Sequence, residues 1–105
     1  LEMPDAETPH LPGESLKLMQ NVPNPFAGTT RISFSIPRAS NVKVEIVTVE
    51  GRLVRTLVNE YTSPGIHEIH WDATSASGAR VAGGIYFYRI VTPDASATRK
   101  MVFLR

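Results

Sequence analysis

Apolar and polar residues alternate along several short stretches of the chain. In residues 31–36, Ile32, Phe34 and Ile36 fall on one face and polar residues fall on the other, which is typical of a half-buried strand. Residues that favour strands also make up stretches 16–18, 42–49, 53–58, 66–71, 85–91 and 97–104. No apolar stripe follows the 3.6-residue spacing of a helix. The pattern therefore predicts an all-β chain.

Turn-forming residues separate these stretches. Pro37 ends the first alternating run, and Glu50-Gly51 predicts a hairpin between residues 42–49 and 53–58, with Gly51 at positive φ. Ser63-Pro64-Gly65 and Pro93-Asp94 are further turn signals. Short strands with turns every ~8–12 residues are typical of a sandwich. We therefore predict an antiparallel β-sandwich of about seven strands.

The aromatic residues admit two interpretations. Trp71, Tyr86, Phe87 and Tyr88 could stack on sugars, as in an accessory carbohydrate-binding module. Adjacent strand residues face opposite ways, so only Tyr86 and Tyr88 share a face. A sandwich this small needs Trp71 and at least one of these rings in its core. Residues 85–91 are apolar on both faces, which indicates a central strand that begins after a tight turn at Gly83-Gly84.

Residues 21–26 carry two prolines at alternate positions, Pro23 and Pro25. Both lack a backbone donor, so the segment cannot be a central strand. Each proline also favours an extended conformation in the residue before it. We predict a stiff, extended segment at a sandwich edge, with Phe26 closing one end of the core.

Charge is distributed unevenly. Residues 1–14 contain four carboxylates, three prolines and no Lys or Arg, which predicts an acidic, Pro-rich linker before a folded domain of residues 15–105. The folded part holds eleven basic and six acidic residues, but they are scattered, so we expect no nucleic-acid partner. No apolar run is long enough for a spanning helix, so we do not expect the chain to span a membrane.

Catalytic and metal-binding patterns are not found. The chain has no cysteine, and no nucleophile is paired with a base. His67 and His70 point to opposite faces of their strand, and His10 lies in the linker. Asp72 follows a strand, where a turn-capping carboxylate is the ordinary role. We expect no enzyme activity, no cofactor and no metal.

Four motifs in order carry a resemblance to a known family. They are residues 18–26 with 29–32, residues 44–54, residues 65–72 with 78–90, and residues 98–105. The chain resembles the type A C-terminal sorting domains of the bacterial type IX secretion system. These domains are similar to the Ig-like domain of the flagellar hook-capping protein. The resemblance implies an Ig-like sandwich.

The resemblance also implies a function. The parent protein would reach the periplasm, and this domain would be read by the outer-membrane translocon. A sortase-like surface protease would cleave within about residues 1–15, where an open linker is accessible. The product would be secreted or held at the cell surface of a Gram-negative bacterium, often joined to anionic lipopolysaccharide.

Two sets of residues follow from the resemblance. The expected recognition residues are Gly51, Arg52, Lys100, Met101, Val102, Phe103, Leu104 and Arg105. The expected structural signature is Asn21, Pro23, Asn24, Pro25, Phe26, Trp71, Asp72, Gly84, Tyr86 and Tyr88. A final strand at a sheet edge would offer unpaired backbone groups for strand addition. A structural Ig-like spacer remains the alternative to sorting, beside the carbohydrate-binding module.

Overall fold

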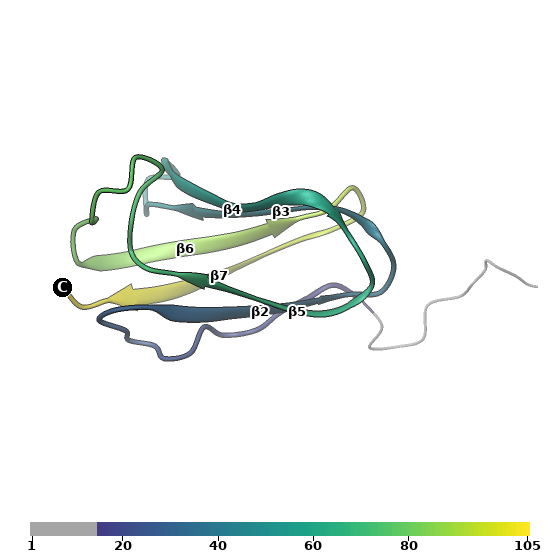
Figure 1. The fold of residues 1–105 in the computed structure, drawn as a ribbon, viewed down its shortest axis with the longest axis horizontal. Helices are drawn as coiled ribbons and strands as arrows, with labels where there is room; N and C mark the ends of the chain where they lie inside the picture. Colours follow the sequence, from purple (N-terminus) through teal and green to yellow (C-terminus); the bar gives the residue numbers. More distant parts are fainter. Residues whose placement is uncertain (1–14) are drawn as a thin grey trace, which may run out of the picture.

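The computed structural model describes residues 15–105, which form seven strands in two antiparallel sheets (Figure 1). One sheet has the order β1 (Lys17–Leu18), β2 (Thr30–Ile36) and β5 (Gly65–Trp71). The other has the order β4 (Leu53–Thr62), β3 (Ser40–Val47), β6 (Gly84–Val91) and β7 (Ser96–Phe103). The predicted β-sandwich of about seven strands is confirmed. The predicted linker, residues 1–14, lies outside the described residues.

The core lies between the two sheets and follows the alternation of the sequence. Ile32, Phe34 and Ile36 of β2 are buried, while Arg31 is exposed. The buried apolar side chains of the core are Leu18, Phe26, Ile32, Phe34, Ile36, Val42, Val44, Ile46, Trp71, Ala73, Tyr86, Tyr88, Ile90, Met101 and Phe103. Burial of each large apolar side chain contributes about 1.5–3 kcal/mol. Nearly every strand therefore contributes to one shared core.

The β3–β4 hairpin forms where Glu50-Gly51 predicted it. Gly51 has a φ of 89°, which L side chains rarely adopt, and its N–H donates to the carbonyl of Thr48 at 2.9 Å. The return strand β4 is longer than predicted, because residues 59–62 continue to pair with β3. Those residues form backbone bonds at a sheet edge with mostly exposed side chains, so they carry no alternating apolar signal.

Strand β6 is central, as its two apolar faces predicted. It pairs with β3 on one side and β7 on the other. Tyr86, Tyr88 and Ile90 point into the core, and Phe87 lies on the opposite face, partly exposed. Among residues 15–105 the structure contains no helix long and apolar enough to cross a membrane.

Truncating Ile46 to alanine tests the position of the core. Ile46 is 0% exposed, so Ile46→Ala should lower the free energy of unfolding by about 2–5 kcal/mol in a urea titration. The matched control Ile66→Ala, at a side chain 74% exposed, should change it by less than about 0.5 kcal/mol. Equal losses in the two variants would contradict this assignment.

Candidate recognition surface at the C-terminal strand

The last strand, β7, forms one edge of the four-stranded sheet, as the edge-strand hypothesis requires. Met101 is 0% exposed and Phe103 is 1% exposed, so both belong to the core. Lys100 and Val102 face outward between them, and Leu104 follows the strand with an exposed side chain. A partner that binds this strand in the folded domain would therefore reach Lys100, Val102, Leu104 and Arg105 rather than the two core residues.

Residues 20–26, here called the strap, run along the outer edge of β7. The Phe26 N–H donates to the carbonyl of Val102 at 3.0 Å, and the Leu104 N–H donates to the carbonyl of Phe26 at 2.8 Å. The Val102 N–H donates to Oδ1 of Asn24 at 2.9 Å. Gln20 Nε2 donates to the carbonyl of Lys100 at 2.9 Å. The backbone groups on this half of the edge are therefore already hydrogen-bonded.

A buried network centred on Asn21 holds the strap in place. The Asn21 side chain is 1% exposed, and its Nδ2 donates to Oγ1 of Thr30 at 2.9 Å and to the carbonyl of Pro23 at 3.1 Å. The Thr30 hydroxyl in turn donates to the same Pro23 carbonyl at 2.8 Å. The Asn21 N–H donates to the hydroxyl of Tyr88 at 2.8 Å, which donates to the carbonyl of Met19 at 2.7 Å. Satisfied buried polar groups of this kind specify one local geometry.

Phe26 closes one end of the core, as predicted. Its ring is 2% exposed and lies 5.9 Å from the ring of Trp71 and 5.1 Å from that of Phe103, centroid to centroid. Trp71 also meets Tyr86 edge-on at 5.5 Å. Aromatic contacts of these geometries each add about 0.5–1.5 kcal/mol beyond burial. The strap is therefore anchored by polar bonds at Asn21 and by apolar packing at Phe26.

Two expectations about this region need correction. The segment of Pro23 and Pro25 does not run extended; it bends between Val22 and Phe26, and both Xaa-Pro peptide bonds are cis. The edge of β7 is also not open along its whole length, because the strap occupies its C-terminal half. The remaining part faces a groove lined by Leu16–Met19 and by Ala97–Arg99. The Asn24–Val102 bond joins residues 78 apart, so no local sequence signal could have revealed it.

The two expected recognition elements lie at the same end of the four-stranded sheet. Val47, at the end of β3, pairs with Phe87, and Gly84 pairs with Phe103 at the end of β7. The Gly51–Arg52 hairpin and the end of the chain therefore extend beyond the same edge of the sandwich. Gly83, the first residue of the predicted turn at Gly83-Gly84, lies so close to the end of the chain that a Cβ there would be 3.1 Å from the backbone nitrogen of Arg105.

Asp72 caps the loop that leaves β5. Its carboxylate accepts a hydrogen bond from the Thr74 hydroxyl and lies 3.7 Å from Nη1 of Arg55. The hydrogen bond from Thr74 is the main cause that lowers the pKa of Asp72 below its ordinary value. The indole N–H of Trp71 donates to the carbonyl of Thr74 at 2.9 Å. Trp71 and Asp72 therefore fix this loop, which is a structural role.

The tyrosine rings of β6 and the imidazole of His67 pack against other parts of the fold. Tyr86 and Tyr88 point into the core, and the Tyr86 hydroxyl donates to the carbonyl of Ala82 at 2.6 Å. Neither ring face is presented to solvent, so Tyr86 and Tyr88 cannot form the sugar-stacking surface that the carbohydrate-binding alternative requires. His67 stacks on Phe34 with centroids 5.4 Å apart. No group of three metal-ligating side chains occurs among the described residues.

Removing the Asn24 side chain tests the strap. Asn24→Ala leaves the outward N–H of Val102 without its acceptor, so hydrogen exchange at that amide should accelerate. The free energy of unfolding should fall by about 1 kcal/mol. Asn59→Ala, at an exposed asparagine of β4, is the matched control and should change neither quantity. Unchanged exchange at Val102 in Asn24→Ala would show that the strap does not protect the edge.

Burial of two tyrosines predicts an alkaline loss of stability. Desolvation raises the pKa of Tyr88 and of Tyr86 above the ordinary value of about 10. The unfolded chain therefore ionises first, so stability should hold below about pH 10 and fall as the pH rises further. In a double variant, Tyr86→Phe with Tyr88→Phe, the melting temperature should fall less steeply as the pH rises above about 10. Tyr61→Phe, at a ring 70% exposed, should keep the wild-type slope; a wild-type slope in the double variant would refute this origin.

Comparison with solved structures finds the same fold in several proteins. The first is the dimeric latent form of PorU from Porphyromonas gingivalis, with a TM-score of 0.69 and 28% identity over 85% of this chain. FlgD from Xanthomonas campestris matches with a TM-score of 0.58 and 25% identity over 85% of the chain and 67% of FlgD. PorZ of P. gingivalis, at 23% identity, a TM-score of 0.55 and 86% coverage of this chain, shows the fold alone.

These neighbours differ greatly in length from the chain described. It spans 9% of PorU and 11% of PorZ. A search of the curated proteins finds no match. The FlgD Ig-like domain family matches residues 20–96, which run from the strap to the start of β7. The chain therefore belongs to the FlgD Ig-like domain family.

Proposed function

We propose that this Ig-like domain is a type A C-terminal sorting module of the type IX secretion system. It directs a parent protein through the outer membrane for secretion or attachment at the cell surface of a Gram-negative bacterium, by way of the periplasm. Its partners are the outer-membrane translocon and the sortase-like surface protease, with anionic lipopolysaccharide as the attachment point. In this role the domain has no enzyme activity and needs no cofactor.

One observation carries the proposal. The part of PorU that matches this chain shares 28% identity with it over 85% of its residues, at a TM-score of 0.69. PorU comes from P. gingivalis, whose PorZ is described as an essential surface component of a type IX secretion system. The four sequence motifs that resemble sorting domains support the same assignment, and they span both ends of the fold.

The arrangement of β7 limits how a translocon could recognise the domain. Strand addition along the C-terminal half of the edge would require the strap to leave, because its bonds occupy Lys100, Val102 and Leu104. Side chains, in contrast, are presented without any rearrangement. Lys100 is exposed, and Arg105 donates from Nη1 to the carbonyl of Val81 at 3.3 Å at the same end of the sandwich. Cations at these positions would orient the domain on an anionic surface.

A fusion experiment tests the proposed function. A reporter with a periplasmic signal peptide, joined to residues 1–105, should reach the cell surface of a host that has the type IX system. The same reporter joined to the Ig-like domain of X. campestris FlgD is the matched control, since it keeps the fold. That control should remain in the periplasm. Surface labelling and protease accessibility measure the outcome, and a wild-type fusion that stays in the periplasm would refute sorting.

Charge removal tests the terminal strand without disturbing the core. A Lys100→Ala and Arg105→Ala double variant should lower surface display several-fold, because two exposed cations near the chain end are lost. The matched control, Lys17→Ala with Lys43→Ala, removes two exposed cations elsewhere and should keep display. Melting temperatures of the purified domains should agree within a few degrees. Equal display in both double variants would exclude these cations from recognition.

A further inference from the structure

An apolar patch crosses the outer face of the four-stranded sheet at the end near the chain terminus. In register, Leu53 of β4 lies opposite Val47 of β3, and Val47 lies opposite Phe87 of β6. In the next row Ile85 of β6 lies opposite Val102 of β7. We call these five residues the outer patch. It extends across all four strands of the sheet.

Val47, at the centre of the patch, is buried without being part of the core. Val47 is 6% exposed, yet it does not belong to the cluster of side chains between the sheets. Its neighbour Ile46 points into the core, so Val47 points outward and is covered by side chains on the outer face. Leu53 and Ile85 at the margins are 54% and 46% exposed. The patch therefore has a buried centre at Val47 and accessible margins.

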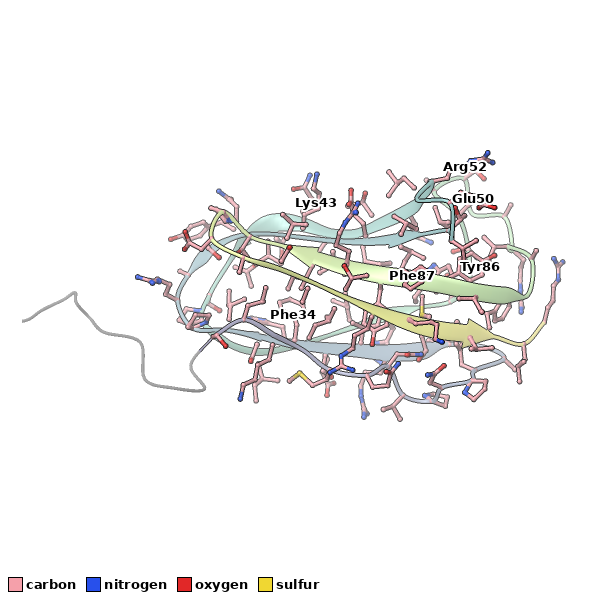
Figure 2. All side chains as sticks on the ribbon, turned by 180° about the vertical axis from the view of Figure 1, so that it is seen from behind. Phe34, Lys43, Glu50, Arg52, Tyr86 and Phe87 are labelled. Atoms are coloured by element: carbon pink, nitrogen blue, oxygen red, sulfur yellow. The ribbon has the colours of Figure 1, made fainter. Side chains whose placement is uncertain are left out.

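The outer patch joins the two elements that the sequence singled out. Leu53 follows directly after the Gly51–Arg52 hairpin, and Val102 lies in the terminal strand. Phe87, between them, was considered from the sequence only as a core or sugar-stacking ring. Figure 2 shows Phe87 in the four-stranded sheet toward the end that bears Glu50 and Arg52. Two segments far apart in the sequence thus border one continuous surface.

Charges around the patch indicate what would bind there. The outer face and its hairpin carry the cations Lys43, Arg52, Arg89 and Lys100 against the carboxylates of Glu45 and Glu50. Arg89 and Lys43 lie 2.9 Å and 3.8 Å from Glu45, so this carboxylate is paired twice and the three side chains together carry one net positive charge. Arg52 and Lys100 border the patch on opposite sides. A second copy of this chain would set cation against cation, which disfavours self-association.

We propose that the outer patch is the docking surface for a protein partner that presents apolar side chains bordered by acidic residues. The inference rests on the proposed function, in which that partner belongs to the secretion machinery. Phe87 supplies the central aromatic contact, and Leu53, Ile85 and Val102 supply the apolar margin. Arg52 and Lys100 pair with the acidic border. Central aromatic residues commonly carry most of the affinity of such interfaces.

The test uses the reporter fusion with single substitutions on the sheet. Phe87→Thr and Leu53→Thr remove apolar surface from the outer patch while keeping a residue that favours strands. Tyr61→Thr is the matched control, because Tyr61 is 70% exposed and pairs with Asn41 at the far end of the same sheet. Thermal melting of the purified domains establishes that each variant folds. A variant that does not fold is replaced by Ile85→Thr, at a 46% exposed side chain of the patch.

Display should fall about tenfold or more for folded patch variants and stay at the wild-type level for Tyr61→Thr. Wild-type domain overproduced alone in the periplasm should compete and lower display of the reporter, whereas overproduced Phe87→Thr domain should not. Normal display of the patch variants beside a displayed wild-type fusion would overturn the docking surface and leave the sorting function standing. A wild-type fusion retained in the periplasm would refute both.

Two further measurements distinguish the proposed protein partner from a second copy of the chain and from a membrane surface. Sedimentation of the purified domain should show a monomer, and a dimer that Phe87→Thr dissociates would assign the patch to a second copy. Any binding of the domain to vesicles of anionic phospholipid should be unchanged in Phe87→Thr, because the exposed cations and not the outer patch would cause it. Vesicle binding that Phe87→Thr abolishes would assign the patch to a membrane surface and overturn the protein partner.

Discussion

The bonding between the strap and the last strand is the constraint on which the rest of this domain depends. Asn21 fixes one end of the strap through buried hydrogen bonds, and Phe26 fixes the other by filling the space between Trp71 and Phe103. The strap follows β1 of the three-stranded sheet and bonds to β7 of the four-stranded one. It therefore joins the two sheets along one side. Without it, β7 would be a bare edge next to an open core.

Most of the fold could be predicted from the sequence because its strands and turns are specified by neighbouring residues. The alternation in residues 31–36 fixed the face of β2, and Glu50-Gly51 fixed a hairpin whose φ only glycine readily adopts. The position of Phe26 at the end of the core was predicted as well. The path of the strap and its bonds to β7 could not be, because they join residues nearly eighty positions apart. The same holds for the outer patch, which exists only once four strands are in register.

The candidate site shows how a small domain divides its apolar residues. The core between the two sheets buries four aromatic side chains, so none of them remains to form a ligand-binding surface: Trp71, Tyr86, Tyr88 and Phe103. The apolar residues left over lie on the opposite side of the same strands, as Phe87 does between Tyr86 and Tyr88. The recognition residues taken from the resemblance are similarly mixed, since Met101 and Phe103 support the fold while Lys100 and Val102 face outward.

The direction of the strap has a mechanical consequence. Phe26 and Phe103 pair in parallel, and the chain enters the strap from one side and leaves β7 from the other. Tension between the two ends of the domain would therefore pull these segments along each other and load their hydrogen bonds together in shear, instead of opening them one at a time. The short bridge at Phe26 and Val102 would then resist this sliding, together with the pairing of β7 to β6 along its whole length.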